Sequence, residues 1–186
     1  PGAGFDMHPH DNMEIVSIVL RGKLQHRDNL GNGDVLKPGD VQKMTAGSGI
    51  IHSEFNPSDK EPVHFLQIWI IPNMLDLRPS YEQKAFNRKS MTNRLTLLVS
   101  PDGHNGSLEI HQDAEIWQIL LEENKDPEFA INHSRKIWIQ VAEGSVSTYE
   151  HLLVAGDGLA VSDEEGIIRL RGIDKLSNII IFNLRA

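Results

Sequence analysis

Two short pairs of side chains near the start of the chain have the spacing of metal ligands. His8-Pro9-His10 places two imidazoles two residues apart, and His52-Ser53-Glu54 places an imidazole and a carboxylate at the same interval. In an extended strand, side chains two residues apart point to the same face, roughly 6 to 7 Å from each other. If the two strands are neighbours in a sheet, the four side chains converge on one point.

Three imidazoles and one carboxylate suit a single divalent transition metal. The sequence contains no cysteine, so a metal must be held by His, Asp or Glu. Iron, copper, nickel, manganese, cobalt and zinc all accept this mixed donor set. A single His-x-His pair is common in surface loops, and His52 alone is typical of a turn. The combination of two pairs, the second preceded by the glycine-rich segment 45–49, favours a metal site.

Glu14 competes with Glu54 for the role of carboxylate ligand. It shares the even parity of the first histidine pair, but an extended chain carries it ~13 Å beyond His10. Only a bulge or turn at residues 11–13 could bring it back. Glu54 needs no such correction, so we favour Glu54. We also expect the even positions of the following strand, beginning at Val16, to continue the face that holds the metal.

The remaining histidines are assigned no metal. His26 lies among charged residues near the end of a predicted hairpin, which indicates a solvated side chain. His104, His111, His133 and His151 are scattered singly through the second half of the chain, outside any His-x-His or His-x-Glu pair. We therefore expect one metal ion per chain, bound in the first half, and we expect these later histidines to be silent.

Strand signals dominate the chain. Short runs rich in β-branched and aromatic residues recur, and turns with Gly, Pro, Asn or Asp separate them. The clearest runs are 15–20, 63–71, 95–99, 116–121, 137–141 and 178–184. Many short strands with frequent turns are typical of an antiparallel barrel or sandwich, so we predict an all-β protein.

One stretch carries helical signals. Residues 79–86 contain Ser80 as an N-cap candidate followed by good helix formers, and they lie in a polar segment, 72–92, which we interpret as a linker. We place the domain boundary at about residue 93. Residues 1–93 then form an N-terminal metal-binding domain with the linker, and residues 94–186 form a C-terminal domain without a metal site. Each half repeats a strand, a glycine, a second strand and a Gly-Asp turn, which favours two copies of one unit.

Composition limits the partners of the protein. The 186-residue chain has a formal net charge of −8, whereas direct binding of nucleic acid requires clustered Lys and Arg. No apolar run approaches the ~20 residues of a membrane helix. We therefore expect a soluble, cytoplasmic protein with neither a nucleic-acid nor a membrane partner. The chain starts at Pro1, close to its first motif, so we also expect that an N-terminal segment is missing from it.

Longer motifs around the two ligand pairs resemble those of a known family. Residues 2–22 resemble the first cupin motif, and residues 39–54 resemble the second. More specifically, the chain is similar to the pirin family of bicupins in four segments, 8–10, 25–28, 38–42 and 44–54. The string that ends in His52-Ser53-Glu54 is the most specific. The resemblance covers nearly the whole chain, and its closest likeness is to bacterial pirin-type quercetin 2,3-dioxygenases.

This resemblance implies two cupin-like β-barrels in tandem, with one mononuclear metal in the first. The family's ligands fall on His8, His10, His52 and Glu54, and iron is the first metal expected. The resemblance further implies an enzyme that cleaves a flavonol such as quercetin with dioxygen and releases carbon monoxide, with Glu54 as the catalytic proton acceptor beside the ion. The alternative is a non-enzymatic pirin-like metal-binding regulator that acts through a protein partner.

Overall fold

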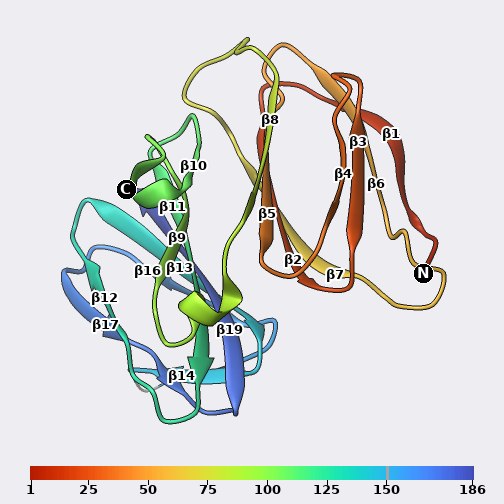
Figure 1. Ribbon diagram of the computed structural model, residues 1–186. Helices are drawn as coiled ribbons and strands as arrows, with labels where there is room; N and C mark the ends of the chain where they lie inside the picture. The colour runs from red at the N-terminus through yellow and green to blue at the C-terminus, as the bar shows by residue number, and fades with distance from the viewer. Residues whose placement is uncertain (150) are drawn as a thin grey trace. The chain divides into compact units, whose positions relative to one another are not determined.

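Figure 1 shows the computed structural model, in which residues 1–149 and 151–186 are described. Apart from the short 3₁₀-helices η1 (Arg88–Met91) and η2 (His104–Gly106), the regular structure of these residues is β-strand. All six predicted strands are present, and the prediction of an all-β fold is confirmed. No helix in the described ranges has the length and apolar character needed to cross a membrane.

The described chain divides into two compact units. The first contains Pro1–Phe86 together with Ile110–Gln112, and the second contains Asn87–Glu109 together with Asp113–Ala186. Each has its own sheets and its own buried apolar residues. We call them the first unit and the second unit.

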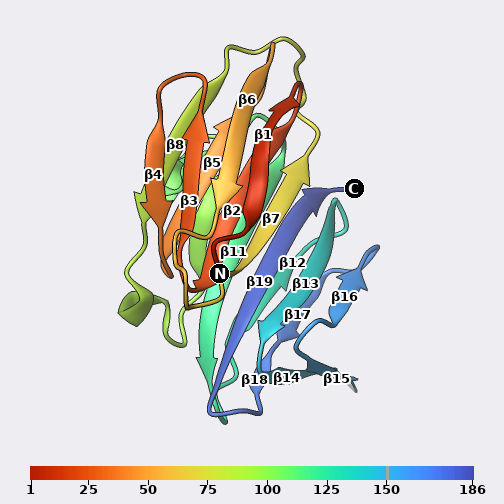
Figure 2. The same cartoon turned by 90° about the vertical axis from the view of Figure 1, so that its right-hand side faces the viewer.

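The first unit consists of two four-stranded antiparallel sheets that face each other (Figure 1). One sheet, in front in Figure 2, has the order β1 (Gly4–His10), β6 (Ile50–Phe55), β3 (Leu24–Asp28) and β4 (Gly33–Leu36). The other has the order β7 (His64–Ile70), β2 (Glu14–Arg21), β5 (Asp40–Thr45) and β8 (Ser80–Ala85). β1 and β7 are therefore edge strands.

The interior of the first unit contains two apolar clusters with buried polar side chains between them. We call these polar side chains, which include Ser17, His26, His52 and Glu54, the polar layer. The clusters are Ile15, Met44, Ala46 and Ile50 in one, and Val19, Leu24 and Leu36 in the other. On β2, Ser17 stands between Ile15 and Val19 and points to the same face, because side chains alternate along a strand. Its hydroxyl donates to Glu54 on the facing sheet at 3.3 Å.

The prediction that the even positions of β2 continue the face that holds the metal is therefore wrong. Odd positions such as Ser17 face the interior, and Val16 points to the opposite side. The reason lies in the connection between β1 and β2, where Asn12 has a positive φ of 45°. This turn interrupts the extended chain, so the parity of His10 is not carried over into β2.

The predicted helix over residues 79–86 is also wrong, because Ser80–Ala85 form strand β8. β8 pairs with β5 along its whole length, from Thr45 opposite Ser80 to Asp40 opposite Ala85. This pairing satisfies the backbone groups of β5 and packs Tyr81 against the apolar cluster of Ile15. Strand pairing and burial of an aromatic ring outweigh the small differences in intrinsic helix propensity.

The second unit contains one six-stranded sheet and two smaller sheets. The large sheet has the order β10 (Leu108–Glu109), β9 (Thr96–Ser100), β11 (Ala114–Glu122), β19 (Leu176–Arg185), β13 (Arg135–Glu143) and β16 (Gly158–Val161). The smaller sheets are β12 (Glu128–Ile131) with β17 (Gly166–Arg169), and β15 (His151–Val154), β14 (Ser145–Thr148) and β18 (Arg171–Gly172).

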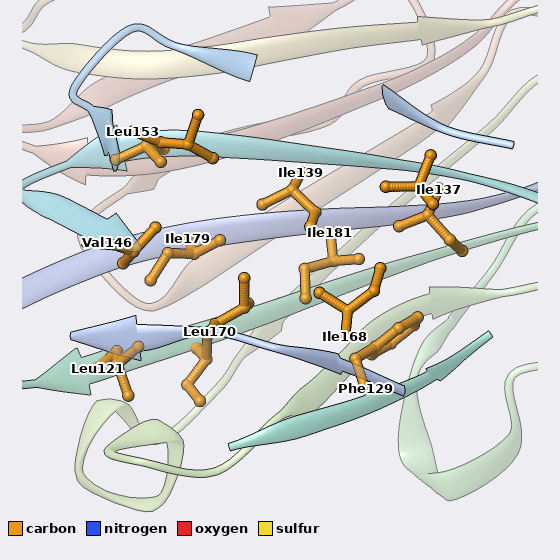
Figure 3. Packing of buried hydrophobic residues seen from close by; sticks show 13 residues of the cluster. Leu121, Phe129, Ile137, Ile139, Val146, Leu153, Ile168, Leu170, Ile179 and Ile181 are labelled. Atoms are coloured by element: carbon orange, nitrogen blue, oxygen red, sulfur yellow. The ribbon is translucent and has the colours of Figure 1, made fainter. Parts of the chain in front are cut away.

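Buried apolar side chains from all three sheets fill the interior of the second unit (Figure 3). Ile139, Ile179 and Ile181 come from the large sheet, and Phe129 and Ile168 come from the two-stranded sheet.

We expect Gly47→Ala to destabilise the protein more than Gly103→Ala. Both glycines have a left-handed backbone, with φ values of 49° and 66°, where an added Cβ costs roughly 1–2 kcal/mol. A Cβ on Gly47 would in addition collide with the carbonyl group of Leu77, whereas a Cβ on Gly103 meets nothing closer than 3.5 Å. Urea unfolding of both variants measures the difference in free energy. Equal losses would contradict the close approach of residues 47 and 77.

Candidate metal centre

His8, His10 and His52 come together on neighbouring strands. β1 and β6 pair with His8 directly opposite His52, and His10 lies two residues further along β1. One ring nitrogen from each histidine lies within 4.8 Å of the others. The ring centroids are 4.4 to 5.1 Å apart. The three imidazoles therefore converge where β1 and β6 meet.

Glu54 follows His52 on the same face of β6 and is only 1% exposed. A carboxylate oxygen of Glu54 lies within 4.8 Å of a ring nitrogen of His52 and of His26. Its Oε1 accepts from the Ser17 hydroxyl at 3.3 Å, and its Oε2 accepts from the Gln67 side-chain amide at 2.5 Å. Both donors belong to the facing sheet, so this carboxylate connects the two sheets of the first unit. His52 therefore belongs to two groups of potential metal ligands. The first also contains His8 and His10, and the second also contains His26 and Glu54.

Unsatisfied nitrogen atoms mark the point where a metal would bind. Both ring nitrogens of His52 and Nε2 of His10 are buried without a hydrogen-bond partner, which is costly for polar atoms. His8 Nδ1 lies 2.7 Å from the carbonyl oxygen of Asp6. Because that oxygen can only accept, Nδ1 carries the proton and Nε2 keeps its lone pair. These residues fit a metal ion with a nitrogen-rich donor set.

The site lowers the pKa values of two of its imidazoles, His52 and His10. Burial, together with repulsion of a second positive charge by His8, His26 and His10, lowers the pKa of His52 to about 3. Burial and His8 also lower the pKa of His10. Neutral imidazoles are the form that binds metals. Burial raises the pKa of Glu54, although the hydrogen bond from Gln67 opposes this shift.

The prediction that His26 is solvated is wrong. Its side chain is fully buried, its Nε2 lies 3.1 Å from Asp28 Oδ2, and its ring stacks on Tyr81 with 4.7 Å between centroids. His26 is paired directly opposite Glu54 across β3 and β6. A signal for this arrangement exists in the sequence. His26 and Asp28 form a third pair two residues apart, and that spacing puts both on one face of a strand.

Glu14 lies away from the histidine cluster. Its Oε2 accepts from the Thr45 hydroxyl at 3.1 Å, and its Oε1 is 3.4 Å from Nδ1 of His111. Burial raises the pKa of Glu14, while Lys43, Thr45 and His111 oppose the shift. Alternation along β2 points Glu14 to the face opposite Ser17. His111 belongs to the first unit and contacts a buried carboxylate, which its isolated position in the sequence did not indicate.

The other isolated histidines lie outside the candidate centre. Within residues 1–149 and 151–186, neither group of three potential ligands includes His104, His133 or His151. His104 Nδ1 is 2.6 Å from Asp102, and His133 Nε2 is 3.4 Å from Glu165. Both are pairs of exposed side chains.

Exposed apolar side chains border the histidines. Trp69 on β7 is 56% exposed, and its ring meets the His10 ring edge-on at 5.0 Å between centroids. Phe5 on β1 is 60% exposed and lies 6.4 Å from the His8 ring. Met7, which lies between Phe5 and His8 on β1, is also exposed. The accessible side of the cluster therefore offers aromatic and apolar contacts.

Comparison with known proteins identifies relatives of both halves of the chain. The family model Pirin matches residues 2–70, and the model of the quercetinase C-terminal cupin domain matches residues 97–184. The chain is 39% identical over 183 residues to the quercetin 2,3-dioxygenase of Escherichia coli K12. The aligned region covers 98% of this chain and 77% of that protein.

Solved structures share the fold. The crystal structure of YhhW from Escherichia coli matches with a TM-score of 0.91 at 39% identity, over 98% of this chain and 76% of that one. The bacterial pirin YhhW has also been solved in complex with nickel(II), and that structure matches with a TM-score of 0.91 at 38% identity, over 99% and 77% of the chains. The prediction of two cupin-like barrels in tandem is confirmed.

We expect the double variant His8→Ala, His10→Ala to lose its metal, because it removes two of the three imidazoles that share one point. Elemental analysis of the purified proteins gives the metal content per chain. His133→Gln is the control, since His133 is 63% exposed and pairs with an exposed carboxylate. Full occupancy in the double variant would contradict the location of the centre.

We expect the metal-free protein to lose stability as the pH falls below about 6.5. His52 takes up a proton near its ordinary pKa of 6.5 in the unfolded chain, but only at about 3 in the folded one. Between these values the unfolded state binds more protons, so acid favours unfolding. Thermal unfolding of metal-free protein over this range measures the effect, and His52→Gln should reduce it. An unchanged pH dependence in that variant would count against His52 as its source.

Proposed function

The chain belongs to the pirin family, and from this membership we propose that it is a metal-dependent dioxygenase that cleaves a flavonol such as quercetin. In this reaction both oxygen atoms of dioxygen enter the products and one carbon of the flavonol leaves as carbon monoxide. The observation that carries the proposal is the convergence of His8, His10 and His52 beside an exposed indole. The name of the Escherichia coli relative supports the substrate class.

We further propose that His8, His10, His52 and Glu54 hold one divalent transition metal. The unsatisfied nitrogens of His52 and His10 support this set. Iron is the first expectation from the family, and the nickel(II) complex of YhhW supports nickel as well. When bound, the ion supplies Lewis acidity that favours the deprotonated form of the flavonol 3-hydroxyl.

Glu54 is the proposed proton acceptor. A general base works best when its pKa is near the working pH, and burial raises the pKa of Glu54 above the ordinary carboxylate value. Its two oxygens are held by Ser17 and Gln67, so the carboxylate keeps its direction. In this role Glu54 takes the proton from the 3-hydroxyl group and holds it beside the site.

The exposed apolar side chains fit a planar aromatic substrate. A ligand of this kind is bound mainly by apolar and aromatic contacts, with a few polar groups that fix its orientation. Trp69 and Phe5 supply aromatic surface next to the imidazoles. The polar groups of the site lie deeper, around Glu54.

We propose that the metal-binding domain comprises residues 1–93 and that residues 94–186 form a cupin-like barrel without a metal site. The apolar filling of the second unit supports this division of roles. The comparisons do not favour the alternative function of a regulator that acts through a protein partner, since the relatives at 38–39% identity carry the names of quercetin dioxygenases.

The proposed reaction is tested by loading the protein with iron(II) or nickel(II) without oxygen and then adding quercetin and air. We expect quercetin to disappear with the release of carbon monoxide in equal amount. The His8→Ala, His10→Ala variant, treated identically, controls for uncatalysed oxidation. Turnover equal in both proteins, or quercetin loss without carbon monoxide, would refute the proposed activity.

Glu54→Gln and Glu14→Gln distinguish the two carboxylates. Glu54→Gln keeps the size of the side chain but removes its charge and basicity, so turnover should fall by at least about 10²-fold and metal should be retained less tightly. Glu14→Gln should be milder, with a loss of metal affinity of at most about 10- to 100-fold, because Glu14 contacts Thr45 and His111 rather than the histidine cluster. Loss of metal from the Glu14 variant alone would overturn the proposed ligand set.

A further inference from the structure

Gln67 on β7 lies between the buried carboxylate of Glu54 and the exposed indole of Trp69. Trp69 Nε1–H donates to Gln67 Oε1 at 3.0 Å. An indole N–H is a donor only, so it requires the oxygen of the Gln67 amide on its own side. The NH₂ group of Gln67 then faces Glu54, where it donates to Oε2 at 2.5 Å. Trp69 thus fixes which end of the amide Glu54 meets.

The amide matters to Glu54 because this carboxylate is otherwise poorly satisfied. Glu54 is 1% exposed, and its other oxygen has only the longer contact with the Ser17 hydroxyl at 3.3 Å. A reversed amide would place the Gln67 oxygen against a carboxylate oxygen and repel it. The orientation of Gln67 therefore decides whether Glu54 keeps its position.

The same indole also contacts the histidine cluster. The Trp69 ring meets the His10 ring at 5.0 Å with an interplanar angle of 77°. One exposed side chain therefore touches His10 directly and reaches Glu54 through a single hydrogen-bonded amide. These contacts link the accessible side of the centre to its deepest carboxylate.

The second unit contains a matching pair that lacks a carboxylate. Trp138 Nε1–H donates to Gln140 Oε1 at 3.3 Å, and Trp138 is 41% exposed. The Gln140 NH₂ group donates to the backbone carbonyl of Asp157 at 2.9 Å. This pair has the same spacing on a strand and comparable exposure, so it serves as an internal control.

We propose that Gln67 is a positioning residue, whose amide is oriented by Trp69 and holds the Glu54 carboxylate in place for metal and substrate. This inference rests on the proposed roles of Glu54 as ligand and proton acceptor. It predicts that removal of either hydrogen bond displaces Glu54 and changes the environment of a bound ion, although neither Gln67 nor Trp69 is a ligand.

Cobalt(II) alone is the probe, because its visible absorption bands report coordination geometry without any turnover. In the full chain, Gln67→Met should weaken cobalt(II) binding by about 10- to 100-fold, the range found when a group that orients a ligand is lost, and should change the absorption bands. Trp69→Phe keeps an aromatic ring but removes the N–H donor. It should shift the bands in the same direction with a smaller loss of affinity. Gln140→Met and Trp138→Phe should leave both measurements at the parent values.

Steady-state kinetics with quercetin add a second measurement. Gln67→Met should lower kcat more than it raises KM, because it displaces the proton acceptor but leaves the apolar contacts. If Gln67→Met does not fold, Trp69→Phe tests the proposal instead. The Trp69 side chain is largely exposed, so its replacement leaves the interior intact. Parental cobalt(II) affinity and bands in a folded Gln67→Met, or in Trp69→Phe if the first variant is lost, would overturn the proposal.

Failure of the proposed function gives a different result. If the parent does not cleave quercetin but Gln67→Met still changes the cobalt(II) bands, the positioning role stands and the reaction is wrong. If Glu54→Gln leaves the cobalt(II) bands unchanged, Glu54 is not a ligand and the positioning role falls with it. If the parent cleaves quercetin and Gln67→Met matches it in bands, affinity and kcat, only the positioning role is wrong.

Discussion

The register between β1 and β6 is the constraint on which the candidate centre depends. It sets His8 opposite His52, and a slip of one residue would turn one histidine pair to the other side of the sheet. β1 is an edge strand, so this register rests on one neighbour. The pairing shifts by one residue between Phe5 and His8, and this irregularity brings His8 opposite His52. At the start of the strand Gly4 is paired with Phe55, where an added Cβ would lie 2.6 Å from the Phe55 Cα. Only a glycine allows so close an approach.

Hydrogen bonds stabilise the two carboxylates, of Glu54 and Asp28, that lie in the polar layer of the first unit. Ser17 and Gln67 on one sheet donate to Glu54 on the other, and Asp28 accepts from His26. A buried carboxylate without such donors would be strongly destabilising. The polar layer buries little apolar surface, and the apolar clusters on both sides of it supply that part of the stabilisation. The core cluster of the second unit consists of apolar side chains.

The features that could be predicted from the sequence are those with a local cause. The period of two in a strand relates His8 to His10 and His52 to Glu54, and β-branched runs mark the strands, so the all-β fold and the convergent histidines followed from spacing. The errors have non-local causes. The pairing of β8 with β5 makes a strand of helix-forming residues. The turn at Asn12 resets the parity of β2, and His26 is buried because β3 pairs with β6.

The lowered pKa of His52 affects how the protein binds metal. In most histidine sites at slightly acid pH, a metal must displace protons before it binds, and affinity falls as acid is added. Here burial, together with repulsion from His8, His26 and His10, lowers the pKa of His52 so far that folding already excludes its proton. The free-energy cost of removing the proton from His52 is therefore part of the free energy of folding. A metal that binds the folded protein therefore displaces little proton from His52.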